Sequence, residues 1–463
     1  MQATTAKRVN ALGTIPALRG SVIRPEDAGY DGARAVFYGG IDKRPAAIVR
    51  VADVADVQRV VAMARDGDHE LAVRSGGHSI AGHSTTNGGV VLDLREMTKV
   101  EIDAVARTAW VETGATALRV TQAAAEHGLV VGFGDSGSVG VGGITLGGGI
   151  GFLVRKHGLT IDSLLAAELV TADGQHLHTD AGRYPELFWA IRGGGGNFGV
   201  VTRLKFRLHE LRQFTGGLLV LPATPATIAG FSAAALAAPE ELTTIGNIMP
   251  APPLPFLPAD VHGRLVILGM IAYAGDADSA GRAIAPFRAL AKPLADTVAP
   301  MPYAGMYPPE DPDVHPSAIG RTMFVDSIDE RTANTIFEYF SSSDAAVRVA
   351  QLRALGGAAA RVPADATAYA HRSRPMLVNV AAFYAGPEDR RVRAAWVDEF
   401  AKAVQPSDPS AYVGFLSDEG EVRTRAAYPG PTWDRLTRIK TEYDPTNLFR
   451  LNQNIPPAHS RAR

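Results

Sequence analysis

The sequence predicts an α+β protein of two domains, and three observations lead to this prediction. The chain has 463 residues, which exceeds what one hydrophobic core usually serves. A strand followed by a helix begins the first domain, and three glycine-rich loops then each follow an apolar run before residue 200. From Leu211 onward, proline and alanine accumulate, and segments with helical and strand-like patterns follow.

The N-terminal elements are predicted from apolar periodicity and capping residues. Residues 1 to about 43 form an entry segment, and Arg44–Val51 is predicted as the first strand. Asp53–Ala64 has apolar residues at helical spacing, with Asp53 as the N-cap. Leu71–Val73 is predicted as the end of a parallel strand, after which the chain becomes polar and rich in glycine.

The second half of the chain is predicted to form the second domain. Eight prolines between residues 211 and 258 predict a connection rich in loops, which we expect to shape a cavity wall or lid. Helices are predicted at Ser279–Ala291, despite Pro286, and at Thr332–Ser342. Strands are predicted at His262–Tyr273 and Met376–Tyr384.

Composition excludes several classes of protein. Lysine and arginine number 46 against 48 acids, and this near-balance argues against nucleic acid or an anionic membrane as the main partner. Apolar runs are far shorter than the ~20 residues of a membrane span, and the N-terminus has no secretory signal, so we expect a cytoplasmic protein. The absence of cysteine excludes disulfides, zinc-cysteine sites and thiol nucleophiles.

The first glycine-rich loop, Arg74–His83, follows the predicted strand end. Paired glycines let the backbone approach a ligand and point successive N–H groups at an anion, and Arg74 adds positive charge. A histidine directly after them, His78, could press against a planar ligand and act as a nucleophile toward an electrophilic carbon. A solvated turn with one polar histidine remains the alternative on this segment alone.

The second glycine-rich stretch, Gly132–Gly151, contains the spacing G-x-G-x-x-G, as does Gly194–Gly199. A dinucleotide-binding Rossmann site needs a helix that opens at the last glycine. We expect no helix in residues 138–151, because each glycine costs roughly 1 kcal/mol relative to alanine, and Val200–Arg207 alternates like a strand. We therefore reject that fold and predict that the three loops are walls of one extended site for an anionic cofactor.

Other chemistries find little support in the sequence. A phosphate-binding P-loop needs a Gly-Lys step, which the chain lacks. The nearest approach to a nucleophile elbow, Gly77–Ala81, ends in alanine, which argues against a serine hydrolase. His176 and His178 alternate on one strand face without a third ligand, so we expect no metal site there.

Five motifs in order resemble one family. The first four resemble the PCMH-type flavin-binding domain of the vanillyl-alcohol oxidase superfamily, and the fifth resembles the C-terminal signature of its berberine-bridge-enzyme-like branch. The resemblance covers about residues 40–211 and 411–457. The motifs are Arg74–Ser79 (RSGGHS), Val139–Gly151 (VGVGGITLGGGIG), His157–Leu165 with Glu168–Gly174, Arg192–Val201, and Tyr443–Pro457.

The resemblance implies a split FAD-binding domain of two α/β subdomains, with an inserted substrate domain of antiparallel sheet covered by helices. The implied bounds are 1–211 for the FAD-binding domain, 212–410 for the substrate domain and 411–463 for a C-terminal segment that returns to the FAD-binding domain. The sequence leaves the oligomeric state open.

The resemblance also implies how FAD is held. In the family, the histidine at the position of His78 is bonded to the 8α carbon of FAD, and most members add a thioether from cysteine to flavin C6. Ser136 stands where that cysteine would be, so a single 8α-histidyl bond through His78 is implied, as in the histidine-only members. The other implied cofactor contacts are Arg74, Ser75, Gly76, Gly77, Ser79, Gly82, His83, Asp135, Ser136, Ser138, Val139, Gly142, Gly143, Gly148, Gly149, Gly199, Val200, Asn452 and Asn454.

Family members transfer a hydride from substrate to flavin, usually while a base removes a proton. Asn379 stands near the position of the family's catalytic carboxylate, and an amide is no base. Ile80 and Phe415 replace two tyrosines, so Tyr412 is the remaining candidate base, or else a core tyrosine with a satisfied hydroxyl. These losses predict a more apolar pocket, suited to an aromatic or alicyclic small molecule.

The resemblance therefore implies an FAD-linked oxidase that acts on an alcohol, an amine or a ring C–H. In the family, a valine at the position of Val139 tends to accompany reaction with dioxygen, which implies dioxygen as acceptor and hydrogen peroxide as product. A dehydrogenase with another acceptor, or a flavin-carrying binding protein without turnover, is the alternative.

Overall fold

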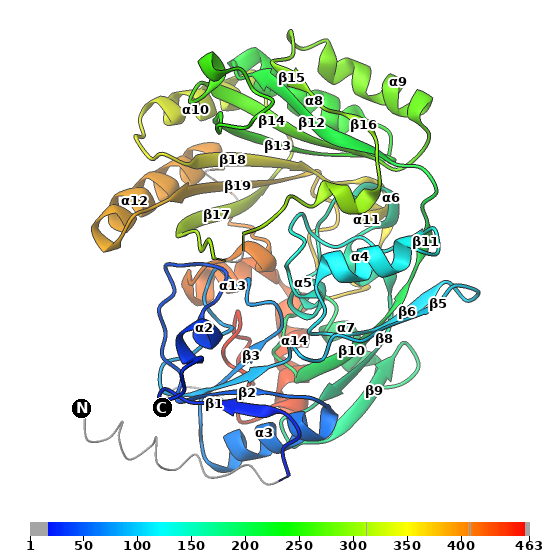
Figure 1. Ribbon diagram of the computed structural model, residues 1–463, viewed down its shortest axis with the longest axis vertical. Helices are drawn as coiled ribbons and strands as arrows, with labels where there is room; N and C mark the ends of the chain where they lie inside the picture. The colour runs from blue at the N-terminus through cyan, green and yellow to red at the C-terminus, as the bar shows by residue number, and fades with distance from the viewer. Residues whose placement is uncertain (1–16, 312, 406, 408, 459–463) are drawn as a thin grey trace.

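The computed structural model describes residues 17–311, 313–405, 407 and 409–458. Figure 1 shows a lower lobe that holds the strands numbered β1 to β11, and an upper lobe built on one large sheet. The C-terminal helix α14 (Pro431–Tyr443) lies in the lower lobe, where Arg435 pairs with Glu186 at 2.5 Å. The mixed α+β class predicted from the sequence is confirmed.

The first sheet of the lower lobe has the strand order β1-β2-β4-β3. The last three strands are parallel, whereas β1 adds an antiparallel edge. Asp53 caps helix α3, as predicted, by accepting a hydrogen bond from the N–H of Asp56. The strand predicted at 44–51 is found, as β2, but it is not the first strand, because the three-residue edge strand β1 precedes it and is too short to show alternation. The elements are β1 (Ser21–Ile23), α2 (Tyr30–Arg34), β2 (Ala47–Arg50), α3 (Val54–Asp66), β3 (Leu71–Arg74) and β4 (Val90–Asp93).

The second sheet of the lower lobe is antiparallel, with the order β5-β6-β10-β8-β9. His176 and His178 lie on β9 beside Glu168 and Asp180. Among the residues described, no three or more histidine, aspartate or glutamate side chains lie together so that they could hold a metal ion. The elements are β5 (Val100–Asp103), β6 (Thr108–Glu112), α4 (Ala117–Ala125), β7 (Leu129–Val130), α5 (Val141–Leu146), α6 (Val154–His157), η1 (Thr160–Ser163), β8 (Leu164–Val170), β9 (His176–Asp180), α7 (Pro185–Ala190), β10 (Val200–Arg207) and β11 (His209–Glu210).

Helix α5 contradicts the prediction that residues 138–151 form no helix. Its Val141 and Thr145 are fully buried, and such tertiary packing overrides a weak intrinsic propensity over six residues. The rejection of a Rossmann fold still holds, on different grounds. The strand before this stretch, β7, pairs antiparallel with β11 rather than within a parallel unit.

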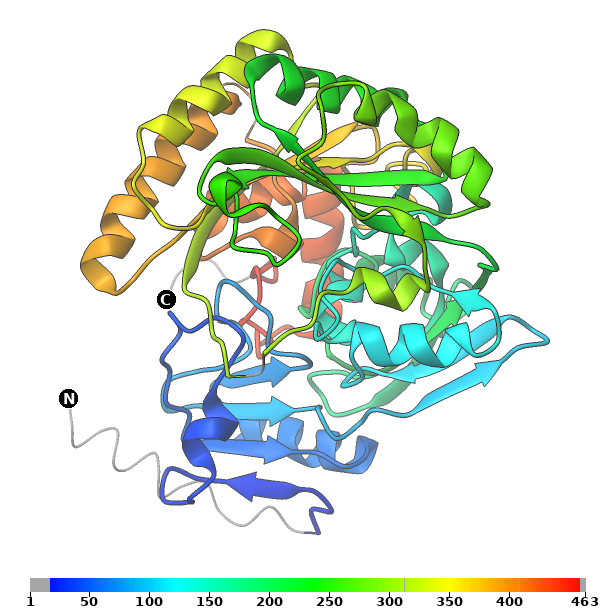
Figure 2. The ribbon, with the colours of Figure 1, turned by 45° about the horizontal axis from the view of Figure 1, so that its top comes forward.

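The upper lobe is built on an antiparallel sheet with the order β15-β12-β14-β13-β18-β19-β17, to which β16 adds beside β12. Figure 2 shows green, yellow and orange helices over its outer face, where apolar residues of α8, α9, α10 and α12 pack on the strands. Within the described residues, no helix is long and apolar enough to cross a bilayer. The strands are β12 (Thr215–Pro222), β13 (Leu242–Pro250), β14 (Leu265–Tyr273), β15 (Ala295–Asp296), β16 (Ala299–Pro300), β17 (Ala318–Val325), β18 (Arg348–Ala354) and β19 (Met376–Phe383).

The predicted helices and strands of this lobe are found, as α9, α10, β14 and β19. Much of the stretch 211–258 forms regular elements rather than the expected loops, because its prolines lie at element ends: Pro222 ends β12 and Pro225 occupies the first turn of α8. The loop after β13 does pack on the inner face of the sheet, through Leu257. The helices are α8 (Pro225–Ala237), η2 (Ala259–Val261), α9 (Ala277–Arg288), η3 (Tyr303–Met306), α10 (Glu330–Ser341), α11 (Gly357–Arg361), α12 (Pro387–Val404), η4 (Val413–Phe415) and α13 (Gly420–Ala427).

Candidate active site

The first two glycine-rich loops cross backbone against backbone. A Cβ atom added to Gly76 would lie 2.2 Å from the backbone nitrogen of Gly140, and one added to Gly140 would lie 2.1 Å from that of Gly76. The hydroxyl of Ser75 donates to the carbonyl of Thr113 at 2.5 Å, while Gly77 has a φ of 79°. Glycine is therefore required here for close approach at Gly76 and Gly140, and for a left-handed conformation at Gly77.

His78 is fixed in this loop crossing by two contacts. Its ring stacks on Phe37 at a centroid distance of 4.1 Å, and its Nε2 lies 2.8 Å from the hydroxyl oxygen of Ser138. Burial lowers the pKa of His78, although Glu310 and Asp135 act in the opposite direction. A neutral, oriented imidazole is the form that can act as a nucleophile.

Glu310 is a member of the site that the sequence did not identify. It lies between η3 and β17, and its carboxylate accepts hydrogen bonds from the hydroxyls of Ser136 and Ser138. Ser136, expected at the position of the family's second tether, is thus paired with a carboxylate from a distant segment of the chain. A lone glutamate in a segment rich in proline and aspartate carries no local signal for such a role.

Arg74 has a different environment from the one expected. Its side chain is 1% exposed, and its guanidinium donates to the carbonyls of Ser84 at 3.1 Å and Ala33 at 2.5 Å. Burial lowers the pKa of Arg74 to about 10, while Asp93 opposes that shift. Because these partners occupy the guanidinium, we assign the expected anion contact to the loop backbone and not to the Arg74 side chain.

The loop continues into a turn closed by Ser79, whose hydroxyl accepts from the N–H of His83 at 3.2 Å. Gly82 has a φ of 71°. Burial, and the charge of Lys43, lower the pKa of His83 to about 4. Its Nε2 atom is buried and has no hydrogen-bond partner among the described residues, which indicates a polar ligand at this end of the loop.

Helix α5 and the glycines after it form the next part of the site. A Cβ atom on Gly142 would meet Thr113, whereas one on Gly143 would meet nothing within 4 Å, so the Gly143 backbone faces open space. Gly148 and Gly149 have φ values of 120° and 79°. The Cβ position of Gly148 lies 3.5 Å from the Tyr412 ring.

Tyr412 is 3% exposed and its hydroxyl accepts from the N–H of Gly149 at 3.0 Å. Burial raises the pKa of Tyr412 to about 12, so the phenol is neutral at pH 7 and can donate a hydrogen bond. Val139, two residues before α5, is half-buried against the core of the lower lobe, and its carbonyl accepts from the N–H of Ala117.

The third glycine-rich loop is joined to the C-terminal segment. Gly199 has a φ of 155° and leads into β10, whose first residue, Val200, is buried in the core around α3. A Cβ atom on Gly196 would lie 2.9 Å from the amide oxygen of Asn452. The amide oxygen of Asn454 is buried without a partner among the described residues.

Asn197, which the sequence analysis did not single out, joins the third loop to the C-terminal segment. Its amide donates to the carbonyl of Gln453 at 3.1 Å and accepts from the N–H of Ile455 at 3.1 Å. The Lys440 ammonium, which is fully buried, donates to the Asn197 carbonyl and to Asp444. The C-terminal motif thereby fixes the third loop.

A row of polar side chains crosses the inner face of the upper sheet. Register places Asn247 opposite Gln351, Gln351 opposite Asn379, and Asn379 opposite Thr322. These residues alternate with the apolar ones that pack under the helices, so the row faces the lower lobe. No partner for the Asn379 amide occurs in the described parts of the chain, whereas Gln351 donates to Asn247 at 2.9 Å.

Arg353, next to this row on β18, joins it to the lower lobe. Its guanidinium pairs with Asp135 at 2.5 Å and bonds the amide oxygen of Gln351 at 2.7 Å. Arg353 is 4% exposed at its side chain, against 28% for Asp135, and it lies over the ring of Phe415. Asp135, expected to contact the cofactor, is thus occupied by an ion pair that links the two lobes.

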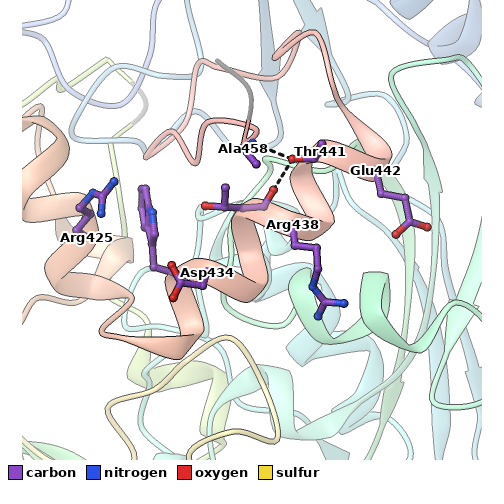
Figure 3. A pocket seen from close by; sticks show the side chains of 8 residues that line it. Arg425, Asp434, Arg438, Thr441, Glu442 and Ala458 are labelled. Atoms are coloured by element: carbon purple, nitrogen blue, oxygen red, sulfur yellow. Dashed lines mark hydrogen bonds between the residues drawn. The ribbon is translucent and has the colours of Figure 1, made fainter. Parts of the chain in front are cut away.

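A hollow of about 600 Å³ lies elsewhere, on the surface of α13 and α14 (Figure 3). It is lined by Trp433, which Arg425 covers at 4.6 Å, and by Arg438 and Thr441. None of its residues belongs to the glycine-rich loops or to the polar row. We therefore do not include it in the active site.

Two family models match the chain. Residues 45–180 match the FAD binding domain model, and residues 411–456 match the model described as berberine and berberine like. The chain is 30% identical to (R)-6-hydroxynicotine oxidase of Paenarthrobacter nicotinovorans over 97% of its own length and 99% of the relative.

Solved structures with the same fold include two oxidases. The crystal structure of 6-hydroxy-D-nicotine oxidase from Arthrobacter nicotinovorans matches with a TM-score of 0.84 and 28% identity, covering 96% of this chain and 99% of that one. Glucooligosaccharide oxidase from Acremonium strictum, which carries a 6-S-cysteinyl, 8α-N1-histidyl FAD, shares the fold with a TM-score of 0.85 and 23% identity, over 97% and 99% of the two chains.

Proposed function

Because the chain belongs to the berberine-like family of FAD-linked oxidoreductases, we propose that it is an oxidase whose FAD is bonded to His78 alone. Its substrate is an aromatic or alicyclic alcohol, amine or ring C–H, and dioxygen is the electron acceptor, reduced to hydrogen peroxide. When bound, FAD supplies the group that accepts a hydride from the substrate.

The residues of the three loops fit this cofactor. The positive φ of Gly77 lets the backbone N–H groups of the first loop form a concavity that suits an anion. The N–H groups of Gly148 and Gly149 are bonded to the Thr145 carbonyl and the Tyr412 hydroxyl, so their part is to let the backbone come close to the cofactor. The open face of Gly143 gives room for a planar ring system. The unpaired buried atoms of His83 and Asn454 supply polar contacts for the same extended ligand.

The environment of His78 is the observation that carries the proposal. Ser138 occupies Nε2 and Phe37 fixes the ring plane, while no described residue bonds Nδ1. Nδ1 is therefore the nitrogen free to bond the 8α carbon of FAD, which is the linkage named for glucooligosaccharide oxidase. Ser136 offers no thiolate for a second bond.

The polar row supports a neutral substrate that forms hydrogen bonds. Asn379, Gln351 and Thr322 present amide and hydroxyl groups toward the lower lobe, and Asp135 neutralises Arg353 beside them. A substrate that accepts from or donates to Asn379 would satisfy the one amide of the row that has no protein partner in the described chain.

Tyr412 orients the substrate in this proposal and does not act as the base. With a pKa near 12 its phenol stays protonated at pH 7, and Asn379 accepts no proton at that pH. Neutral hydrogen-bond donors and acceptors of the chain thus position the substrate, and buried residues such as Tyr412 exclude water from it.

Two measurements on the purified protein test the proposal. Anaerobic mixing with panels of amines, alcohols and cyclic phenols should bleach the flavin absorbance with at least one neutral cyclic compound. Readmission of air should then restore the oxidised spectrum and form one hydrogen peroxide per flavin. Bleaching by no compound, or reoxidation only over many minutes after dithionite reduction, would contradict an oxidase.

A further inference from the structure

Glu310 reaches the flavin-attachment histidine through a chain of two hydrogen bonds. The hydroxyl of Ser138 donates to the carboxylate of Glu310 and lies 2.8 Å from Nε2 of His78. The hydroxyl of Ser136 donates to the other carboxylate oxygen at 2.7 Å. Glu310 thus bridges the two serines from a segment 172 residues further along the chain than Ser138.

Counting protons fixes the tautomer of His78. A serine hydroxyl has one proton to donate, and Ser138 donates it to Glu310. Toward His78 the same oxygen can only accept, so Nε2 must carry the ring proton. A neutral imidazole with its proton on Nε2 has its lone pair on Nδ1, the nitrogen that no described residue bonds.

We propose that Glu310, acting through Ser138, is a positioning residue that holds His78 in the Nε2–H tautomer and takes up that proton as Nδ1 bonds the flavin. This inference rests on the proposed covalent attachment. The new bond joins Nδ1 to the 8α carbon and replaces one C–H bond of the methyl group, whose proton moves to a flavin ring nitrogen. The two electrons released reduce the flavin, and dioxygen reoxidises it, taking up these electrons together with the proton on the flavin nitrogen and the proton held by Glu310 to give hydrogen peroxide.

The contacts around His78 favour Glu310, and not another group, as the acceptor of the ring proton. Asp135 is the other carboxylate that acts on the ring, but it is paired with Arg353 at 2.5 Å. Phe37 holds the ring plane and offers no proton acceptor. Without Glu310, the Ser138 hydroxyl is free to donate to Nε2, which would move the ring proton to Nδ1 and remove the nucleophilic lone pair.

The experiment follows covalent attachment itself and not turnover. FAD-free protein, produced under riboflavin limitation, is mixed with FAD in air, and flavin bound to the denatured chain is measured over time by its fluorescence. In Glu310→Ala, attachment should slow roughly 100-fold, the lower end of what a positioned acid–base group contributes. Affinity for FAD before attachment should stay near that of the parent protein.

Asp311→Ala is the matched control, because this neighbouring acid is exposed and its carboxylate accepts from the N–H of Asp313; it should attach FAD at the parent rate. Formate, but not chloride, should restore the rate of Glu310→Ala by filling the place of the carboxylate. Should the alanine variant fail to bind FAD, Glu310→Gln decides, since it keeps the volume and should be slow and insensitive to formate.

Attachment at the parent rate in Glu310→Ala, or in Glu310→Gln, would overturn the inference. So would a slow variant that formate fails to restore although FAD binds normally, because that result indicates a structural role. If the parent protein itself forms no covalent bond at His78, the proposed function fails instead, and the two failures are thereby distinguished.

Discussion

Replacing Gly76 by alanine should force apart the two loops that hold the flavin. The added methyl would lie 2.2 Å from the backbone nitrogen and 2.8 Å from the Cα of Gly140. Since ordinary contact begins near 3.4 Å, the loops must separate by about 1 Å, and backbone atoms cannot rotate away as a side chain would. We expect a cost of about 1 to 3 kcal/mol, as for other overpacked positions, and the loss of the contact between His78 and Ser138.

Gly143→Ala is the matched comparison, because its methyl meets nothing within 4 Å in the protein. Thermal unfolding of FAD-free protein should show a lower Tm for Gly76→Ala. For Gly143→Ala the Tm should be equal or higher, because alanine favours a helix by about 1 kcal/mol over glycine. Titration with FAD should show weaker binding for both, since the Gly143 methyl projects into the flavin site. A Gly76→Ala protein with the parent Tm, or a Gly143→Ala protein with the parent affinity for FAD, would refute this reasoning.

Three further predictions concern oxygen, acid and substrate. Val139→Leu should slow reoxidation of the reduced flavin by dioxygen in stopped flow while reduction by substrate stays nearly unchanged, because in the proposed site one methylene would fill space beside the flavin ring; equal rates would exclude a gate at this position. Burial lowers the pKa of His157 to about 3. Below pH 6.5 this histidine therefore takes up a proton in the unfolded chain but not in the folded protein, so the free energy of unfolding falls by up to about 1.4 kcal/mol per pH unit as the pH decreases. His157→Phe, which keeps the stack on His209, should show a shallower loss of stability between pH 6.5 and 4 in urea unfolding; an unchanged slope would contradict this assignment. Asn379→Leu should raise the KM of the best substrate by roughly tenfold, the value of one hydrogen bond, without changing reoxidation by dioxygen, and an unchanged KM would remove Asn379 from the site.

Local signals in the sequence were sufficient for the parts of the site that one segment builds. The strand end at Leu71–Val73 and the glycines after it predicted the loop that carries His78, since both features lie within ten residues. Asp53 predicted the start of α3 for the same reason. The C-terminal motif could be placed against the first domain only through its resemblance to a family.

Features that depend on distant segments were not predictable. Glu310 and Ser138, which share a hydrogen bond, are 172 residues apart in the sequence. The Arg74 guanidinium donates to backbone carbonyls, and no sequence pattern predicts where those carbonyls lie. Helix α5 forms because its apolar residues are buried, which overrides propensity. Gln351 and Asn379 do stand out as polar residues within apolar strands, but the strand register that aligns them is not readable from the chain.

The central claim is that one covalent bond, at His78, holds the flavin. The most direct test is acid precipitation of the purified protein, followed by proteolysis and mass mapping of every peptide that carries flavin. We predict that the pellet stays yellow and that a single flavinyl peptide is found, which contains His78. Complete release of FAD into the supernatant, or a flavinyl peptide that lacks His78, would contradict the account.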